Sequence, residues 1–250
     1  MKREEARKKE DRTPSAGVRL NKYLADAGIC SRRDADKLIE EGVVRIDGEI
    51  PEVGRRVLPG DVVTCRGEVV GKRTQTVVLA YYKPVGVTCS ERDAHAERLV
   101  TKEIDYPVRV TYAGRLDRDS EGLLLLSNDG DLIEAMMRGS NAHEKEYVVK
   151  VGKELRPEDL KRMEEGIYLK DLDQTTRPCK TEILGKNTFR ITLTQGLNRQ
   201  IRRMCKACGY EVKSLKRVRV LNITLGKLLP GEYREVKGEE LRELLRSCGR

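Results

Sequence analysis

The chain has 250 residues, and its 38% hydrophobic residues and 22 glycines place it among ordinary globular proteins and exclude wholesale disorder. No window approaches the roughly 18 consecutive apolar residues of a membrane span, and no apolar stretch follows the charged N-terminus, so we expect a cytoplasmic protein without a signal peptide. Fifty Lys and Arg residues against 41 Asp and Glu give a net charge of +9, which indicates a polyanionic partner, with nucleic acid as the first candidate.

The chain begins with an arm and two predicted helices. Residues 1–16 carry six basic and four acidic side chains without apolar periodicity, and we expect them to form a disordered basic arm. From Leu20, apolar residues recur at helical spacing until Gly28, a typical C-terminal stop, and they predict a short helix. Ser31 then stands three residues before Asp34, the pattern of an N-cap, which predicts the start of a second helix.

Strands and a linker follow these helices. Alternating residues predict two strands that turn back at Asp47-Gly48, the second ending at Val53, and a third strand in the sequence DVVTC. Residues 66–76 are polar, basic and contain glycine, which predicts a linker. We therefore expect a small α-α-β domain over residues 17–75 and a second domain over residues 76–250.

The first of these domains carries a set of basic side chains on its helices. The set consists of Arg19, Lys22, Arg32, Arg33 and Lys37, with Ser31 at the predicted N-cap. Basic residues in the first turn of a helix oppose the helix dipole, so Arg32 and Arg33 do not serve helix stability. They suit a phosphate group at the helix N-terminus, although charge alone fits a solvated basic face equally well. The segment VRLNKYLADAGICSRRDADKLIEEGVVRIDGEI resembles S4-type RNA-binding domains over its whole length, and this resemblance implies that the set binds RNA.

Strand-like runs outnumber helical ones in the second domain. Strands are predicted at VVLAYYKP, around residues 181–184, at FRITLTQ and at RVLNITL, and helices at residues 132–137, 157–165, 198–208 and 239–247. This distribution predicts an α+β domain with a mainly antiparallel sheet.

The most informative segment of the second domain has the sequence YAGRLDRDSEGLLLLSNDG. Three acids at alternate positions lie beside two arginines and precede four consecutive leucines. An EF-hand loop also has alternate acids, but here its ninth and twelfth positions are Leu125 and Asn128, which excludes that calcium site. No complete P-loop and no G-x-G-x-x-G sequence occurs, so we expect no nucleotide cofactor.

The segment GRLDRDSEGLLLLSNDGDL resembles the catalytic motif of the pseudouridine synthases of the RsuA/RluF branch, in which the Asp of the R-L-D triplet is the catalytic group. The resemblance continues through YYKPVGVTCS, HEKEYVVKV and TQGLNRQIRRMCKACGYEVKSLKRVRV, and with the S4-like block it covers nearly all of residues 18–240. It implies that Asp117 is the catalytic carboxylate of an RNA isomerase and that Lys83-Pro84 shapes the pocket wall.

The implied reaction breaks the bond between ribose C1′ and uracil N1, turns the base, and joins C5 to C1′. Nothing is consumed, so the resemblance implies no cofactor. The target uridine has to leave its stack, and base flipping costs roughly a few kcal/mol that contacts with the protein offset. The carboxylate acts either as a nucleophile on the sugar or as a base at C2′, and the sequence leaves both roles open.

A basic helix is predicted towards the end of the chain. Its basic face consists of Arg199, Arg202, Arg203 and Lys206, and its apolar face of Ile201, Met204, Cys205 and Cys208. Residues 199–219 hold eight basic side chains against the single acid Glu211, which predicts an RNA-binding surface that also includes Asn198. The resemblance implies that Arg202 turns inward as the cation beside Asp117.

Two further site residues depend on the resemblance. Tyr147 matches the active-site tyrosine that stacks on the target base and is a candidate acid or base for the C5 proton, although a tyrosine in a strand is more often half-buried core. Arg115 either fills the gap left by the flipped base and so contacts RNA, or is a simple turn arginine, and the sequence leaves both open.

The cysteines predict no metal site. Cys205 and Cys208 form a C-x-x-C pair, which is half of a zinc site, but no second pair exists at a suitable spacing and both histidines lie far upstream. The pair is therefore predicted to be buried and structural, and the odd total of seven cysteines favours reduced thiols.

Together these observations predict a monomeric RNA pseudouridine synthase that modifies one uridine of 23S ribosomal RNA. The sequences HEKEYVV and QGLNRQIRRMC, which resemble the RluF-type enzymes, favour 23S RNA. The alternatives are the same chemistry on 16S ribosomal RNA or on a tRNA, and a catalytically silent assembly factor that binds ribosomal RNA. The presence of Asp117, Tyr147 and Arg202 argues against the silent protein.

Overall fold

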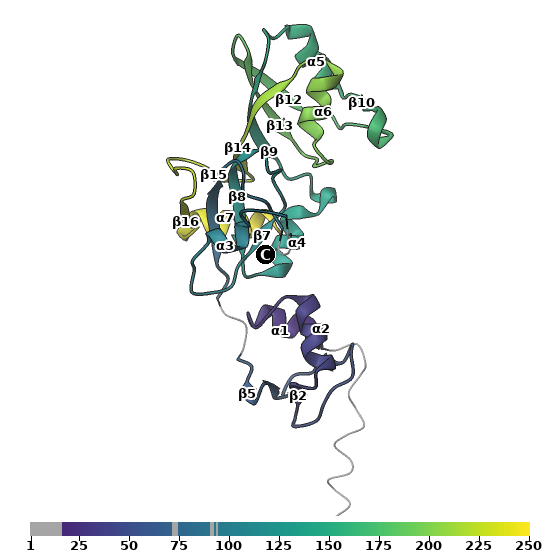
Figure 1. Ribbon diagram of the computed structural model, residues 1–250, viewed down its shortest axis with the longest axis vertical. Coiled ribbons are helices and arrows are strands. Elements are labelled where there is room, and N and C mark those ends of the chain that lie inside the picture. Colours follow the sequence, from purple (N-terminus) through teal and green to yellow (C-terminus); the bar gives the residue numbers. More distant parts are fainter. Residues whose placement is uncertain (1–16, 72–74, 91–92, 94) are drawn as a thin grey trace, which may run out of the picture. The chain divides into compact units, whose positions relative to one another are not determined.

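The computed structural model describes residues 17–71, 75–90, 93 and 95–250 (Figure 1). The chain divides into two compact units at the junction of Gln75 and Thr76, and each unit has its own hydrophobic core. The expected disordered arm, residues 1–16, lies outside the described residues.

The first unit contains two helices and short strands. Its elements are β1 (Val18–Arg19), α1 (Leu20–Asp26), α2 (Arg32–Glu40), β2 (Val44–Ile46), β3 (Arg56–Val57), β4 (Val63–Cys65) and β5 (Glu68–Val69). Both predicted helices form, and the Ser31 hydroxyl caps α2 by accepting a hydrogen bond from the Asp34 amide at 3.2 Å. The core beneath them combines Leu20 and Leu24 of α1 with apolar side chains of α2, β2 and β4.

The strand pairing in the first unit differs from the prediction. Asp47 and Gly48 have the positive φ angles of the expected turn, but only one bridge, Ile46 to Glu49, forms across it. Strand β2 pairs with β4 instead. The segment that was expected to be the second strand is almost wholly exposed and contains Pro51, so it has no apolar face to bury and lacks a backbone donor. The predicted linker also contains a strand, since β5 pairs with β4.

The second unit is built around one large sheet, and β10 and β11 form a separate two-stranded sheet. The strands of the unit are β6 (Val78–Lys83), β7 (Thr111–Ala113), β8 (Glu121–Ser127), β9 (Lys145–Val151), β10 (Tyr168–Leu169), β11 (Gln174–Thr175), β12 (Lys180–Gly185), β13 (Thr188–Leu193), β14 (Val212–Val220), β15 (Ile223–Thr224) and β16 (Tyr233–Glu235). Its helices are α3 (Val100–Glu103), α4 (Gly130–Met137), α5 (Pro157–Glu165), α6 (Gln200–Ala207) and α7 (Gly238–Ser247), with short 3₁₀ turns at Gly139–Asn141 and Lys170–Leu172.

The strands of the large sheet follow the order β12-β13-β9-β14-β8-β6-β16, with β7 beside β8 and β15 beside β14. Every pair is antiparallel except β14 with β8. The predicted α+β fold with a mainly antiparallel sheet is therefore confirmed, and the single parallel pair joins its two antiparallel halves.

Strand β8 explains the run of four leucines. Successive side chains of a strand point to opposite faces of the sheet. Leu123 and Leu125 accordingly belong to the core formed with α4 and α7, whereas Leu124 and Leu126 belong to the core on the other face. A strand that is buried on both faces needs apolar residues at consecutive positions, which is why the run does not alternate.

Glycine is required where the two halves of the sheet meet. Gly122 has φ +107°, and a Cβ atom there would lie 2.2 Å from the backbone oxygen of Arg217 on β14. Any other residue would therefore separate β8 from β14 at the start of β8.

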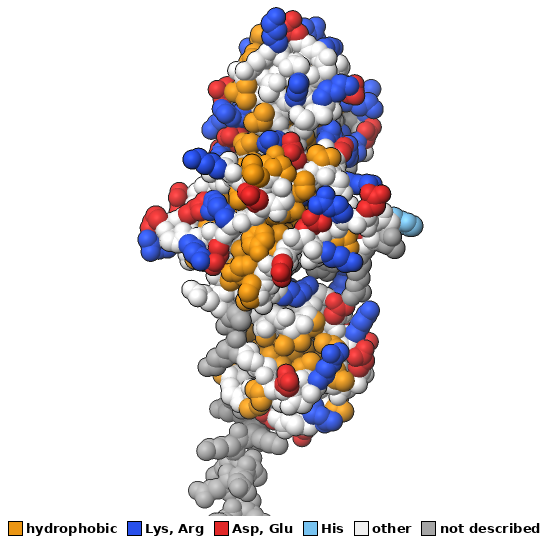
Figure 2. Space-filling view, turned by 60° about the vertical axis from the view of Figure 1, so that its left-hand side comes forward, with side chains coloured by type: hydrophobic (Ala, Val, Ile, Leu, Met, Phe, Trp, Pro, Cys, Tyr) orange, Lys and Arg blue, Asp and Glu red, His pale blue; other side chains and the backbone are white. Residues whose placement is uncertain are grey.

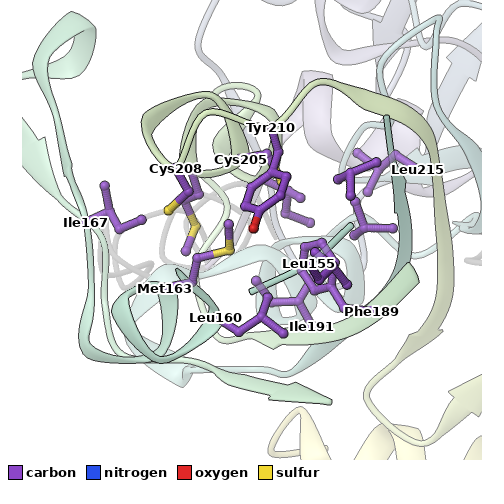
Figure 3. Close-up of a cluster of buried hydrophobic side chains, with 14 of the residues drawn as sticks. Leu155, Leu160, Met163, Ile167, Phe189, Ile191, Cys205, Cys208, Tyr210 and Leu215 are labelled. Carbon is purple, nitrogen blue, oxygen red and sulfur yellow. The ribbon is translucent and has the colours of Figure 1, made fainter. Parts of the chain in front are cut away.

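A further core packs against strands β9 and β13 of the sheet and contains the C-x-x-C pair. Figure 3 shows Cys205 and Cys208 packed together with Tyr210, Met163 and Leu160. Burial raises the pKa of Cys205 to about 12, so this thiol stays protonated and is not an accessible nucleophile. The prediction of buried, structural thiols is confirmed.

Charge is mixed on the surface of the molecule. The face in Figure 2 carries basic, acidic and hydrophobic side chains side by side, so the net positive charge does not cover this face uniformly. Among the described residues, no helix is both long and apolar enough to cross a membrane.

Candidate active site

A cavity of about 410 Å³ opens in the second unit. Its wall contains the basic residues Arg115, Arg138, Lys145, Arg177, Arg199 and Arg217. Among the described residues that line it, Asp117 is the single carboxylate, and Tyr147 lines the same cavity. The structure thus brings together Asp117, Tyr147, Arg115 and Arg199 from segments that are far apart in the sequence.

Asp117 lies on a tight turn between β7 and β8. The Ser120 amide donates a hydrogen bond to the Asp117 carbonyl at 3.1 Å, which closes the turn. The neighbouring loop supports it, since the Gly86 amide donates to the Arg118 carbonyl at 2.8 Å. The fully buried Lys83 holds this loop by donating to the Pro84 and Val87 carbonyls, both at 2.9 Å. Lys83 is absent from the lining of the cavity, so its role is to support the turn and not to form the wall.

The cation beside Asp117 is Arg199. Its Nη1 lies 3.3 Å from Asp117 Oδ2, and its side chain is 41% exposed. Arg199 precedes α6 and has a left-handed backbone with φ +50°, which places it outside the regular helix. Arg202, which the resemblance implies as this cation, donates from Nη2 to the Asp119 carbonyl at 2.8 Å and to Ser120 Oγ at 3.2 Å.

Asp119 joins both arginines. Arg199 donates to its two carboxylate oxygens at 3.2 and 2.9 Å, and Arg202 lies 3.3 Å from Asp119 Oδ1. Partial burial alone would raise the pKa of Asp119, but the hydrogen bond from Arg199 and the charges of both arginines outweigh this effect and lower it.

Strand β9 and the segment just before it contribute three side chains to the cavity at alternate positions. His143 precedes the strand, and Lys145 and Tyr147 belong to it, so the period of two places all three on one face. Burial and the charge of Arg217 lower the pKa of Lys145. Tyr147 is half-buried and packs against the cores on both sides of the site, which fixes its ring in place.

The floor and the rim of the cavity hold two further arginines. Arg217 is 3% exposed and donates from Nε to the Leu123 carbonyl at 2.7 Å. Arg177 is exposed and donates from Nη1 to the Gly139 carbonyl at 3.1 Å, which ties two loops together beside the opening.

The remaining residues of the predicted basic surface near α6 are partly engaged within the protein. Arg203 forms an ion pair with Asp171 and donates from Nε to the Asn198 carbonyl at 3.0 Å. Lys206 is exposed. The acids that balance α6 therefore come from distant segments, which a count of charges within residues 199–219 does not reveal.

The predicted RNA-binding residues of the first unit lie on its surface. Arg19, Arg32, Arg33 and Lys37 are exposed, and Lys22 pairs with Asp26 at 2.6 Å. The Ser31 hydroxyl is occupied in capping α2, where it also donates to Asp34 Oδ2 at 2.8 Å.

Sequence reasoning missed several residues of the site. Alternation from Tyr147 would have found His143 and Lys145, and the spacing of two from Asp117 would have found Asp119. Arg217 lies within the basic run that was noted, but nothing in that run distinguishes it. Arg177 has no local signal. In the described part of the chain, no cluster of three or more His, Cys, Asp or Glu side chains forms a candidate metal site.

Comparisons with known proteins agree with this geometry. A family model described as RNA pseudouridylate synthase matches residues 77–207, and an S4 domain model matches residues 18–63. The dual-specificity RNA pseudouridine synthase RluF of Escherichia coli (strain K12) is 43% identical over 235 residues, which cover 93% of this chain and 80% of that protein. The ribosomal large subunit pseudouridine synthase B of Bacillus subtilis (strain 168) is 37% identical over 235 residues, which cover 90% of this chain and 95% of that protein. A crystal structure of a pseudouridylate synthase superimposes with a TM-score of 0.68 at 29% identity, covering 91% of this chain and 99% of that one.

Proposed function

The chain belongs to the RNA pseudouridylate synthase family and is an isomerase of uridine in RNA, and on this premise we propose that it modifies one uridine of 23S ribosomal RNA with Asp117 as its catalytic carboxylate. The observation that carries the proposal is the position of Asp117 as the single carboxylate among the described residues of a cavity with six basic side chains. The name of the Bacillus relative supports large-subunit RNA as the target.

The cavity suits a flipped nucleotide. Its basic wall attracts the phosphates on either side of the target, and its half-buried Tyr147 offers a ring on which uracil stacks. Asp117 is 33% exposed at the cavity and carries Arg199 beside it, so the carboxylate is both accessible to a ribose and held in one orientation. Isomerisation consumes nothing, and the site therefore needs no further reactant.

The remaining predicted residues have supporting roles in this proposal. Arg202 holds the turn that carries Asp117, Arg115 contacts RNA at the cavity, and Asn198, Arg203 and Lys206 extend the contact along α6. Arg19, Lys22, Arg32, Arg33 and Lys37 form the RNA-binding face of the first unit, and Ser31 supports it by capping α2. In this proposal the protein acts in the cytoplasm as a monomer, and a single chain supplies Asp117, Tyr147 and Arg199 to the cavity.

The test is to map pseudouridines in total RNA from cells that lack this protein, using carbodiimide-dependent stops of reverse transcription. We expect one site in 23S RNA to be lost and to return with the native protein but not with Asp117→Asn, which removes the charge with little change in volume. Return of the site with Asp117→Asn would contradict the catalytic role of this residue.

The same experiment separates the alternatives. The relative from Escherichia coli is named dual-specificity, which is the reason to map tRNA alongside ribosomal RNA. If the only pseudouridine lost lay in 16S RNA or in tRNA, that RNA would be the substrate in place of 23S RNA. If no pseudouridine were lost, the protein would be better explained as an RNA-binding assembly factor.

A further inference from the structure

Asp119 is a second carboxylate on the turn that carries Asp117. Asp117 lines the cavity, whereas Asp119 does not, and the Asp119 side chain is 48% exposed. Its two oxygens and its carbonyl are nevertheless bound by two arginines, Arg199 and Arg202, which lie 80 and 83 positions further along the chain. These contacts fix the Asp119 side chain in place, which indicates a role beyond that of a solvated surface charge.

One of these arginines is shared between the two carboxylates. Nη1 of Arg199 lies 3.2 Å from Asp119 Oδ1 and 3.3 Å from Asp117 Oδ2, while Nη2 lies 2.9 Å from Asp119 Oδ2. The planar guanidinium thus binds Asp119 with both nitrogens and reaches Asp117 with one.

Arg199 depends on this contact for its position. Its backbone is left-handed and precedes α6, its side chain is 41% exposed, and a long exposed side chain samples many rotamers. A single exposed ion pair such as that with Asp117 contributes little by itself. The bidentate contact with Asp119 is what holds the guanidinium in one plane.

The second arginine fixes the turn itself. Arg202 is 15% exposed on the side chain and donates to the Asp119 carbonyl and to Ser120 Oγ, so it binds the turn to the first part of α6. Asp119 therefore contacts one largely buried arginine, Arg202, and one more exposed arginine, Arg199.

We propose that Asp119 is a positioning residue, which holds the Arg199 guanidinium against the Asp117 carboxylate and so orients that carboxylate towards the ribose. The inference rests on the proposed catalytic role of Asp117. Displacement of a reacting group by about 1 Å costs roughly a hundredfold in rate, so the loss of this contact reduces the rate of the chemical step and leaves RNA binding unchanged.

The test measures single-turnover release of tritium from 23S ribosomal RNA that is transcribed in vitro with [5-³H]uridine. We expect Asp119→Asn to lower the rate at saturating protein roughly tenfold to a hundredfold while the Kd for the same RNA stays within about twofold. Asp119→Glu, which keeps the charge, recovers most of the rate. The double variant Asp119→Asn with Arg199→Ala is no slower than Arg199→Ala alone. Either change by itself already removes the positioned guanidinium from beside Asp117, so the two effects do not add.

Asp171→Asn is the matched control, because Asp171 pairs with Arg203, another arginine of α6. It should keep the native rate. A native rate in Asp119→Asn overturns the inference, and so does a loss of rate that merely follows a loss of folded protein in circular dichroism. Tritium release by Asp117→Asn contradicts the proposed function instead, and absence of release by the native protein contradicts both.

Discussion

Arginines stand at the N-terminal ends of both α2 and α6, but the two sets of arginines have different surroundings. At α2 the cap is the Ser31 hydroxyl, and Arg32 and Arg33 are exposed. At α6 the first residue is preceded by a left-handed Arg199, and the arginines bind acids on another segment. The arginines at α6 are thus engaged by a carboxylate from a distant segment, whereas the guanidinium groups of Arg32 and Arg33 lie at the surface of the first unit.

The largest effect is expected at Arg199. Arg199→Ala should reduce single-turnover pseudouridine formation roughly a hundredfold with little change in RNA affinity, because it removes the guanidinium that orients Asp117. Arg199→Lys should restore only a small part of the rate, since an ammonium group cannot bind two oxygens of Asp119 in one plane. Tritium release from labelled RNA measures both. If Arg199→Ala weakened only the affinity for RNA and left the rate unchanged, Arg199 would be an RNA-binding residue, as proposed for Arg32 and Arg33.

The opposite pattern is expected at α2. Replacing Arg32 and Arg33 together with alanine should weaken binding to 23S RNA by roughly tenfold and reduce the slope of log affinity against log salt by between one and two, because about two phosphate contacts are lost. The rate at saturating protein should stay native. Filter binding at several salt concentrations measures the slope, and an unchanged slope would mean that these residues form only a solvated face.

The cap of α2 gives a smaller effect, on stability. Ser31→Ala should lower the free energy of unfolding of the first unit by about 1 kcal/mol, because the Asp34 amide loses its hydrogen-bond acceptor. Urea unfolding followed by circular dichroism measures it, with Ser31→Thr as the variant that keeps the cap. A neutral Ser31→Ala would show that solvent satisfies this amide equally well.

The smallest effect concerns pH. The pKa of Asp119 is lowered in the folded protein, so its contribution to stability is present above the unfolded value of about 3.9 and is lost as the pH falls through the folded value. The stability of Asp119→Asn should therefore depend less steeply on pH than that of the native protein between about pH 5 and pH 2. Thermal melts across this range measure the difference, and parallel curves would contradict it.

Sequence reasoning succeeded where the determining forces are local. The N-cap at Ser31 and the apolar faces of α5, α6 and α7 depend on residues within a few positions of one another. It failed for the strand after Gly48, where partner choice depends on β4, and for the ion pairs of α6, where the acids lie on another segment. The family resemblance supplied Asp117, but the orientation of Arg199 follows from one left-handed residue that no periodicity predicts.

The parallel pairing of β8 with β14 affects the order in which this protein becomes active. Arg217 and Leu123, which are joined by a hydrogen bond across this pair, are 94 positions apart in the sequence. The cavity is lined both by residues before β8, such as Asp117, and by residues of β14, such as Arg217. Contacts of such long range form late, because the intervening chain has to be ordered first. In a polypeptide that emerges from the ribosome, we therefore expect the first unit to be complete before the cavity of the second unit has formed.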